Sequence, residues 1–521
     1  MKKTFILIKK HIGGINELIL SLYSSFVFSS YSFIVNKSFI NVLRGVIVCV
    51  FLSFLFCPVF LRYLSKLDSD KLFKNENENY GKKLRALFYL IPLAVFLFHY
   101  IAFYPGGYMP DTIDQFAQTV DNHYNDWHPV LQTLIALKLP LLLTGGWAGA
   151  PALFQLLLFS AVIGYSTNRI MDYSNKKYAV IALTFILINP QINCASVILW
   201  KDYTFAAFAL LLTAFTMNIV YTKGEWIKKP VNTVLFVLLL TVLTLTRHNA
   251  ILFTLPVLIA VLFYVTKKRG ALIVLCTVLL VAGIKYPLYS AMKVEAPDSR
   301  QIETLGMPMT IIGAVASEGP DSLDDEIREF AFKIIPEKNW KKNYELGTYN
   351  SIKYNDKSDN EVIEKYGAKK IIPYMFRCFL KSPLICVKAF VKLTDPIYTL
   401  TDDYNALDYP YVANNEFNIF PKGIEALQLP VFLHIELSNI VLPYLTVYIG
   451  AMHMLLLVFA LMKCKLNKKR SITRLLFVLP VFAYNFGTSL FLSSYLDSSR
   501  FFLYTFMITP VLMTIINKKE T

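Results

Sequence analysis

Long apolar runs recur along this 521-residue chain, and they constrain its fold more than any other feature. A helix needs roughly 20 apolar residues to cross the hydrocarbon core of a bilayer. We therefore predict an all-α polytopic membrane protein with about 12 transmembrane helices. The runs lie near residues 16–36, 39–61, 86–104, 149–165, 178–196, 203–221, 231–246, 249–265, 271–289, 431–462, 475–494 and 501–516.

The composition favours a membrane protein over a soluble one. Hydrophobic residues make up 55% of the chain and charged residues only 17%, whereas soluble domains carry about 25% charged residues. The formal net charge of +16 does not indicate a nucleic-acid binder, because the basic residues fall between apolar runs and not on one folded face. The 7 cysteines form no Cys-x-x-Cys pair, so neither a zinc site nor a disulfide framework is indicated.

The basic residues predict the orientation of the spans, because loops rich in Lys and Arg stay on the cytoplasmic side. With the predicted number of spans, every basic segment falls inside and both termini are cytoplasmic. The first run, 16–36, could instead lie on the membrane surface, since Glu17 stands at its start and serine is frequent. More than half of the 52 Lys and Arg residues lie in segments 1–10, 62–85, 166–178, 222–230, 266–270, 463–474 and 517–521.

Two segments depart from the pattern of simple spans. Segment 128–146 is apolar but contains Lys138, and we predict that it forms a helix along the outer membrane surface. Segment 290–430 is far more polar and is predicted to be a small mixed domain outside the membrane. This divides the chain into a transmembrane module at 1–289, the outer domain, and C-terminal transmembrane helices at 431–521. An amphipathic stretch near 371–394 is typical of an interfacial helix, with basic residues at helical spacing: Arg377, Lys381, Lys388 and Lys392.

The most unusual polar residues lie in the first outer loop, 104–130, which contains neither Lys nor Arg. Asp111, Asp114, Gln115 and Gln118 follow the spacing i, i+3, i+4, i+7, so on a helix they share one polar face. A purely structural alternative is that Asp111 complements the positive N-terminus of that helix. Because this alternative does not explain Asp114, we expect the carboxylates to face a cavity.

The same loop ends in Asn-Asp-Trp-His-Pro, so that Asp126 and His128 directly precede an apolar segment. The structural alternative is that Trp127 anchors the chain at the membrane interface and His128 only starts a helix. Several cations stand in the outer turns between spans, where a charged group is an expensive choice for a simple connection. They are Lys201, Arg247 with its neighbour His248, and Arg500.

An acidic cluster with several cations at one mouth of a helix bundle suits transfer of a group from a phosphate leaving group. A carboxylate can take the proton from an attacking hydroxyl, and Lys or Arg can neutralise the departing phosphate. Phosphate on the outer face indicates a lipid-linked substrate, because no nucleotide sugar is supplied there. Gly-rich nucleotide motifs and His/Glu zinc motifs are absent from the sequence. The pattern indicates no cofactor, although the loop carboxylates would accept Mg²⁺ or Mn²⁺.

These residues resemble the GT-C superfamily of integral-membrane glycosyltransferases, in particular its protein mannosyltransferase and aminoarabinose transferase branches. In those branches the first outer loop opens with an acidic pair and ends with a His-Pro-Pro-Leu or Asp-Trp element. Here Asp111 and Asp114 match the pair, spread to Asp-x-x-Asp. Asp126-Trp127-His128-Pro129-Val130 matches the closing element, with valine in place of the second proline.

The resemblance implies an inverting sugar transferase at the outer face of a bacterial plasma membrane. Its donor would be a polyprenyl-phosphate sugar, and its acceptor an envelope glycan, teichoic acid, lipid or protein. Asp111, in preference to Asp114, would be the catalytic base, while Asp126 and His128 would shape the pocket. The donor phosphate would lie near the outer cations, which are Lys201, Arg247, His248 and Arg500.

Two other functions fit the sequence. An envelope-polysaccharide polymerase or ligase also has many spans, a large outer loop and outer arginines, and it would depend on Arg more than on Asp111. A transporter or lipid flippase would need ionisable groups at the bilayer midplane and paired halves. The predicted spans carry few charges and show no internal repeat, which favours the transferase.

Overall fold

The computed structural model describes residues 14–35, 38–64, 80–296, 300–400, 409–462, 468–496 and 499–518. Within these ranges the chain is helical, and extended backbone pairs only in isolated β-bridges. The predicted all-α class is therefore confirmed. Among the described residues, six helices are long and apolar enough to cross a membrane. They are α2 (Ile15–Val35), α3 (Phe39–Leu64), α4 (Lys82–Ala102), α8 (Ala150–Tyr173), α11 (Lys201–Tyr221) and Lys267–Ala291, which combines α14, η3 and α15.

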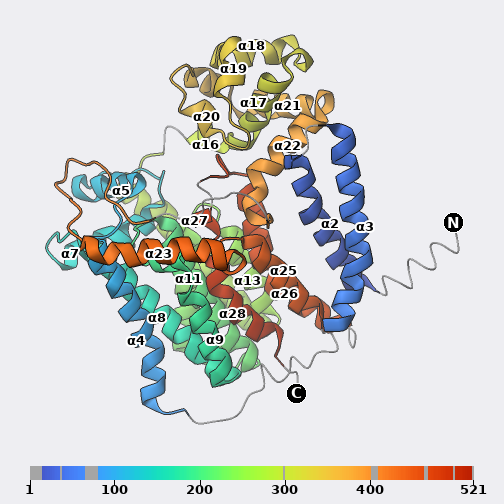
Figure 1. Cartoon of the computed structure of the whole chain (residues 1–521). Helices are drawn as coiled ribbons and strands as arrows, with labels where there is room; N and C mark the ends of the chain where they lie inside the picture. Colours follow the sequence, from blue (N-terminus) through green and yellow to red (C-terminus); the bar gives the residue numbers. More distant parts are fainter. Residues whose placement is uncertain are drawn as a thin grey trace.

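Helix α11 forms the centre of a helix bundle (Figure 1), and nearly all of its residues are buried. Its sequence is apolar on every side, and such a helix is stable only when other helices surround it. Its neighbours are α8, α12 (Pro230–Thr246), α13 (Ile251–Leu262) and α28 (Tyr504–Ile516). The bundle also contains α9 (Lys176–Leu187), α25 (Ile449–Met462) and α26 (Lys468–Ser489).

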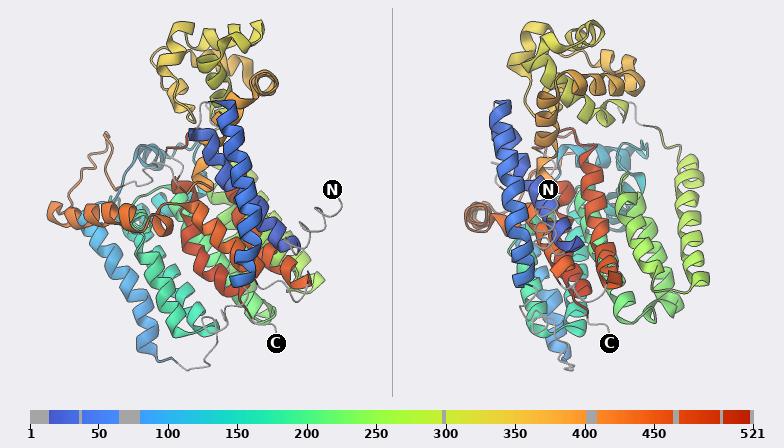
Figure 2. Two further views of the ribbon diagram at one scale, coloured as in Figure 1. Left: turned by 45° about the vertical axis from the view of Figure 1, so that its right-hand side comes forward. Right: turned by 90° about the vertical axis from the view of Figure 1, so that its right-hand side faces the viewer.

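Two peripheral elements leave most of their apolar surface uncovered. Helices α2 and α3 form a hairpin on one side of the bundle, and Lys267–Ala291 stands along another side (Figure 2). Both carry large exposed side chains, such as Phe51 and Leu279. Exposed apolar helices of spanning length are expected where lipid is the solvent.

Residues 431–462 do not form the single span predicted from their hydropathy. Helix α23 (Glu425–Val441) lies across one end of the bundle, and α24 (Pro443–Thr446) links it to α25 (Figure 1). The break falls at Pro443, which lacks an N–H and disfavours helical backbone in the preceding residue. Helix α23 is fixed there by hydrogen bonds to the C-terminal ends of α4 and α9, because the last carbonyls of a helix lack helical partners. Gln428 Nε2 donates to Ala102 O at 2.9 Å, and His434 Nε2 to Ile188 O at 3.0 Å.

The polar segment between the two transmembrane parts contains a separate helical unit at residues 300–394 with its own buried core. The predicted mixed character was wrong, because the described residues of this unit form no strand. Apolar residues here recur at helical spacing, as in Ile327, Phe330, Ala331 and Ile334 of α18. Its helices are α16 (Arg300–Thr304), α17 (Gly306–Glu318), α18 (Asp325–Ile334), α19 (Glu337–Asn343), α20 (Asn350–Lys353), α21 (Asn360–Lys381) and α22 (Pro383–Thr394).

The amphipathic stretch predicted as one interfacial helix is divided into α21 and α22. The chain leaves helical geometry at Ser382, with φ −133° and ψ 57°, directly before Pro383. Helix α22 is the last helix of the unit and runs from it toward the bundle, where it packs against α2 (Figure 1). There the Nζ of the buried Lys392 donates to the carboxylate of Asp395 at 3.0 Å.

Candidate functional site

The loop between α4 and α5 (Pro110–Asp121) is fixed against the start of α11 by backbone pairing. Gly107 N–H donates to Val197 O at 2.8 Å, and Leu199 N–H donates to Gly107 O at 3.2 Å. A Cβ on Gly107 would meet Ile198 at 3.0 Å, so glycine permits this close approach. The pairing places the N-terminus of α5, which carries Asp111, beside the N-terminus of α11, which carries Lys201.

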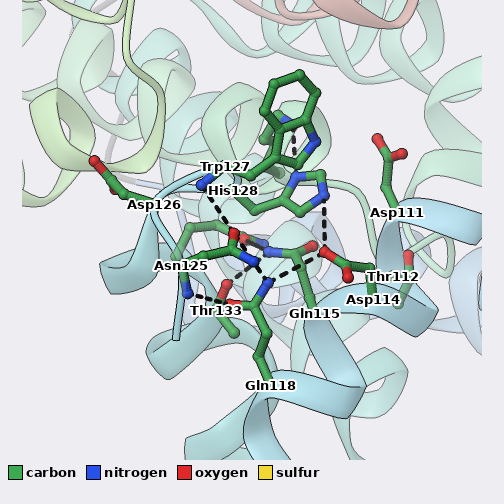
Figure 3. A network of polar contacts seen from close by, with 12 residues as sticks. Asp111, Thr112, Asp114, Gln115, Gln118, Asn125, Asp126, Trp127, His128 and Thr133 are labelled. Carbon is green, nitrogen blue, oxygen red and sulfur yellow. Dashed lines mark hydrogen bonds and ion pairs between the residues drawn. The ribbon is translucent and has the colours of Figure 1, made fainter. Parts of the chain in front are cut away.

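The polar face predicted for α5 is present, but its two halves have different surroundings. Gln115 and Gln118 are buried, and Gln115 Nε2 donates to Gln132 Oε1 at 2.5 Å. The carboxylates are open, with 38% of the Asp111 side chain and 53% of the Asp114 side chain exposed. The amides therefore hold α5 in place, while the carboxylates remain accessible (Figure 3).

Asp114, His128 and Lys201 form a chain of direct contacts. Lys201 Nζ lies 2.8 Å from His128 Nδ1. His128 Nε2 lies 3.6 Å from Asp114 Oδ2 (Figure 3). Because an ammonium group can only donate, Nδ1 is the acceptor and the neutral ring carries its hydrogen on Nε2, facing the carboxylate. Burial holds the pKa of His128 well below 6.5, and the positive charge of Lys201 lowers it further.

The pKa of Asp114 is raised, whereas that of His128 is lowered. Partial burial raises the pKa of its carboxyl group, and the negative charge of Asp111 adds to this, while a hydrogen bond from Gln118 opposes it. Gln118 Nε2 donates to Asp114 Oδ2 at 3.1 Å. Gln118 and His128 thus both contact the same oxygen atom of Asp114, Oδ2.

A second chain of ion pairs runs from Asp111 into the bundle. Arg500 Nη2 lies 3.7 Å from Asp111 Oδ2, and Arg500 Nε lies 3.5 Å from Asp202 Oδ2. Asp202 Oδ1 in turn lies 2.5 Å from Arg247 Nη1. The Arg500 guanidinium also stacks over the ring of Trp200 at 4.0 Å. Side chains from three separate segments of the chain therefore meet at Asp202.

Arg247 lies deeper than the other cations of the cluster. Only 7% of its side chain is exposed. Its guanidinium lies 4.6 Å from the centre of the Phe501 ring, and the rings of Phe205 and Tyr484 are also within 6 Å. Arg247 contacts Asp202 from the interior of the bundle, and Asp202 in turn contacts Arg500. Arg500 and Lys201 stand nearer the open carboxylates.

Asp126 and His248 lie apart from the two carboxylates of α5. The Asp126 side chain points to the other side of its loop (Figure 3), where its carboxylate forms an ion pair with Lys285. The exposed His248 donates from Nε2 to the backbone carbonyl of Asp126 at 3.0 Å. The loop backbone is also held by Glu295, whose carbonyl accepts from Asp126 N–H at 2.9 Å. Asp126 and His248 therefore belong to a separate set of contacts, beside the carboxylates of α5.

Two lysines within apolar helices hold the loop that follows α5. Each lies on a π-helical turn, a local widening found often near functional sites: Lys138 on η1 (Leu134–Lys138) and Lys285 on η3 (Ile284–Leu288). Lys138 Nζ donates to Thr119 O at 2.6 Å and to Asn122 Oδ1 at 2.8 Å. The two lysines thus fix the two ends of the loop that leads to His128.

Among the described residues, no group of three or more His, Cys, Asp or Glu side chains is placed to hold a metal ion. The open carboxylates Asp111 and Asp114 remain the oxygen ligands that Mg²⁺ or Mn²⁺ would use.

A comparison with protein families gives one match, to a family of unknown function, DUF6020, over residues 120–415. The chain belongs to this family. No curated protein and no solved structure matches it. The matched region of the DUF6020 chain includes His128, Lys201 and Arg247, while Asp111 and Arg500 lie outside it. The family match therefore covers only part of the cluster that the fold assembles.

The fold of the DUF6020 chain joins six of the residues singled out in the sequence into the two contact chains, namely Asp111, Asp114, His128, Lys201, Arg247 and Arg500. Sequence reasoning missed the role of Asp202, which pairs with arginines far away in the chain. It also missed Lys285, although a lysine inside the apolar run 271–289 was a visible signal.

The buried, neutral His128 leads to a prediction about stability and pH. Below about pH 6.5 the unfolded chain binds a proton at this histidine that the folded chain does not, so stability falls as the pH decreases. The loss approaches about 1.4 kcal/mol per pH unit for one such group. In thermal unfolding of the detergent-solubilised protein, His128→Asn should lose less stability than the wild type between about pH 7.5 and 5.5.

The Asn side chain at position 128 retains an oxygen that can accept from Lys201. Equal pH slopes for the wild type and His128→Asn would contradict the assignment of a neutral His128.

Proposed function

We propose that the chain is an integral-membrane glycosyltransferase of the GT-C type. It transfers a sugar from a polyprenyl-phosphate donor to a cell-envelope acceptor at the outer face of a bacterial plasma membrane. The observation that carries this proposal is that the open carboxylates Asp111 and Asp114 are linked by contacts to Arg500 and, through His128, to Lys201. A base and a phosphate-neutralising cation are the two groups that such a transfer needs in one site.

In the proposed reaction, Asp111 accepts the proton of the acceptor hydroxyl while the hydroxyl oxygen forms a bond to the anomeric carbon of the sugar. The bond from that carbon to the phosphate oxygen breaks, and its electron pair leaves with the polyprenyl phosphate. Lys201 and Arg500 neutralise the charge on the departing phosphate. Attack opposite the leaving group inverts the configuration at the anomeric carbon.

Asp111 is the better candidate for the base than Asp114. Oδ2 of Asp114 accepts a hydrogen bond from Gln118 and faces the Nε2–H of His128. Asp114 therefore orients these two side chains. Asp111 contacts the guanidinium of Arg500 at 3.7 Å, and a donor phosphate that binds Arg500 would compete for this contact. Donor binding thus frees the base for the acceptor hydroxyl.

We further propose about twelve spans, cytoplasmic termini and an outer location for the helical unit at 300–394. The support is the placement of the cluster along the helices. Helix α12 ends, and α13 begins, at the turn that carries Arg247, while their other ends border the basic segments 222–230 and 266–270. The positive-inside rule places those basic segments in the cytoplasm and therefore the cluster outside.

The experiment that tests the proposal is identification of the lipid that co-purifies with the protein, followed by a transfer assay with that lipid. Mass spectrometry of the extracted lipids is expected to find a polyprenyl monophosphate or its sugar derivative. A polyprenyl-diphosphate oligosaccharide would instead identify a polysaccharide polymerase or ligase. Movement of a lipid between leaflets without transfer of a sugar would identify a flippase, and either result would overturn the proposal.

A further inference from the structure

The second half of α21 has two apolar faces, which is unusual for a helix at the surface of a small helical unit. One face, with Ile371, Tyr374 and Cys378, is buried in the core of the 300–394 unit. A helix partnered on one side normally carries polar residues on the other. Helix α21 does not, and its second apolar face has no counterpart within the described residues of the unit.

The second face consists of three residues at positions i, i+4 and i+8, which form one stripe on a helix. Ile372 is 39% exposed, Phe376 59% and Leu380 83%. Gly367, with φ +61°, bends α21 just before this segment, so all three residues of the stripe lie on the part of the helix that follows the bend. Single exposed apolar residues are ordinary, but a continuous stripe marks an interaction surface.

Basic residues border the stripe. Lys369 and Lys370 are exposed at its start, and Lys381 is exposed at its end. At the same end, Arg377 and Lys381 form ion pairs with Asp324, which fix the helix to α18. An apolar stripe with a lysine border is the pattern by which helices lie on a membrane with negatively charged headgroups.

The position of the stripe identifies its partner. Figures 1 and 2 place the C-terminal end of α21 and the start of α22 beside the outer end of the α2–α3 hairpin. That end of the hairpin is itself apolar, with Val35, Phe39 and Ile40 more than half exposed. The end of α21 that carries Leu380 therefore lies near two helices that have the length and hydropathy of membrane spans.

We infer that the Ile372–Phe376–Leu380 stripe docks on the anionic phospholipid surface of the membrane that the chain itself spans. This contact holds the 300–394 unit against the leaflet through the second half of α21. This inference does not depend on the proposed enzymatic function, since it rests on exposure, charge and proximity to the spans alone.

The test places a genetically encoded photo-crosslinking amino acid at position 380 of the full-length protein in native membranes. Irradiation followed by mass spectrometry is expected to show a phospholipid adduct at this position. The matched control is the same amino acid at position 338, because Lys338 is exposed on α19, at the end of the unit far from the bundle (Figure 1). Position 338 should give no lipid adduct.

Three outcomes would overturn the inference: no lipid adduct at position 380, equal lipid adducts at both positions, or a cross-link from position 380 to a second copy or another protein. The charge requirement is tested in reconstituted vesicles. The adduct yield should fall severalfold when phosphatidylglycerol is replaced by phosphatidylcholine. The double variant Lys369→Gln/Lys370→Gln should lose most of this dependence, and an unchanged dependence would contradict the role of the lysine border.

Discussion

Replacement of Asp111 by Asn is expected to abolish sugar transfer while leaving the protein abundant and folded. Asn has nearly the same shape but cannot take the proton from the acceptor hydroxyl, and a general base contributes about 10²- to 10⁴-fold to a rate. A loss of at least about 100-fold in transfer of labelled sugar, at equal protein level in the membrane, is therefore expected. Folding should be retained, because the side chain is 38% exposed.

The matched control for this experiment lies on the same helix. Asp121, at the other end of α5, is exposed, and Asp121→Asn should transfer sugar at the wild-type rate. Asp114→Asn is expected to lower the rate by less than Asp111→Asn, because Asp114 orients its neighbours. If Asp114→Asn abolishes transfer and Asp111→Asn does not, the base is Asp114. Near wild-type transfer by both variants would remove the α5 carboxylates from the mechanism.

The sequence predicted the location of the polar cluster because charged groups are costly next to apolar spans. Arg247 interrupts a long apolar stretch, and Lys201 stands at the start of one, so the position of each charge indicates a specific role. The helical spacing of Asp111 and Asp114 also predicted their shared face. The physical information needed for these inferences is local in the chain.

The contacts between these residues were not predictable in the same way. Asp202 pairs with Arg247 and Arg500, which approach it only after three helices have packed together. The orientation of Asp126 depends on Lys285, which reaches the loop from a π-helical turn of a distant span. Spacing along a sequence shows which side chains share a face, but tertiary packing decides which of them meet.

The breaks within apolar segments were also missed, although each has a local cause. Residues 431–462 are too long for one span, and Pro443 marks the point where the chain turns from α23 to α25. In the same way Pro383 separates α21 from α22. The mean hydropathy of a segment is little changed by one such proline. It therefore shows that the segment is apolar, but it does not show where the helix ends or changes direction.

Replacement of Asp202 by Asn is expected to destabilise the protein strongly. Asp202 is buried between two arginines, and its loss leaves the buried Arg247 without its carboxylate partner at 2.5 Å. Removal of one partner from a buried ion pair costs about 3–5 kcal/mol, whereas replacement of both partners by uncharged residues costs less. The double variant Asp202→Asn/Arg247→Met should therefore unfold at a higher temperature than Asp202→Asn alone.

The measurement is thermal unfolding of the detergent-solubilised protein at one pH and salt concentration. It compares four proteins, namely the wild type, Asp202→Asn, Arg247→Met and the double variant. The matched control is Glu329→Gln on α18, which removes one partner of an exposed ion pair with Lys333. Because exposed pairs are screened by water, this variant should unfold at the wild-type temperature. If Asp202→Asn were as mild as Glu329→Gln, then Asp202 would not hold the two arginines. In that case Arg500 must be positioned by Trp200 and Asp111 alone, and the two contact chains of the cluster would be independent of the bundle interior.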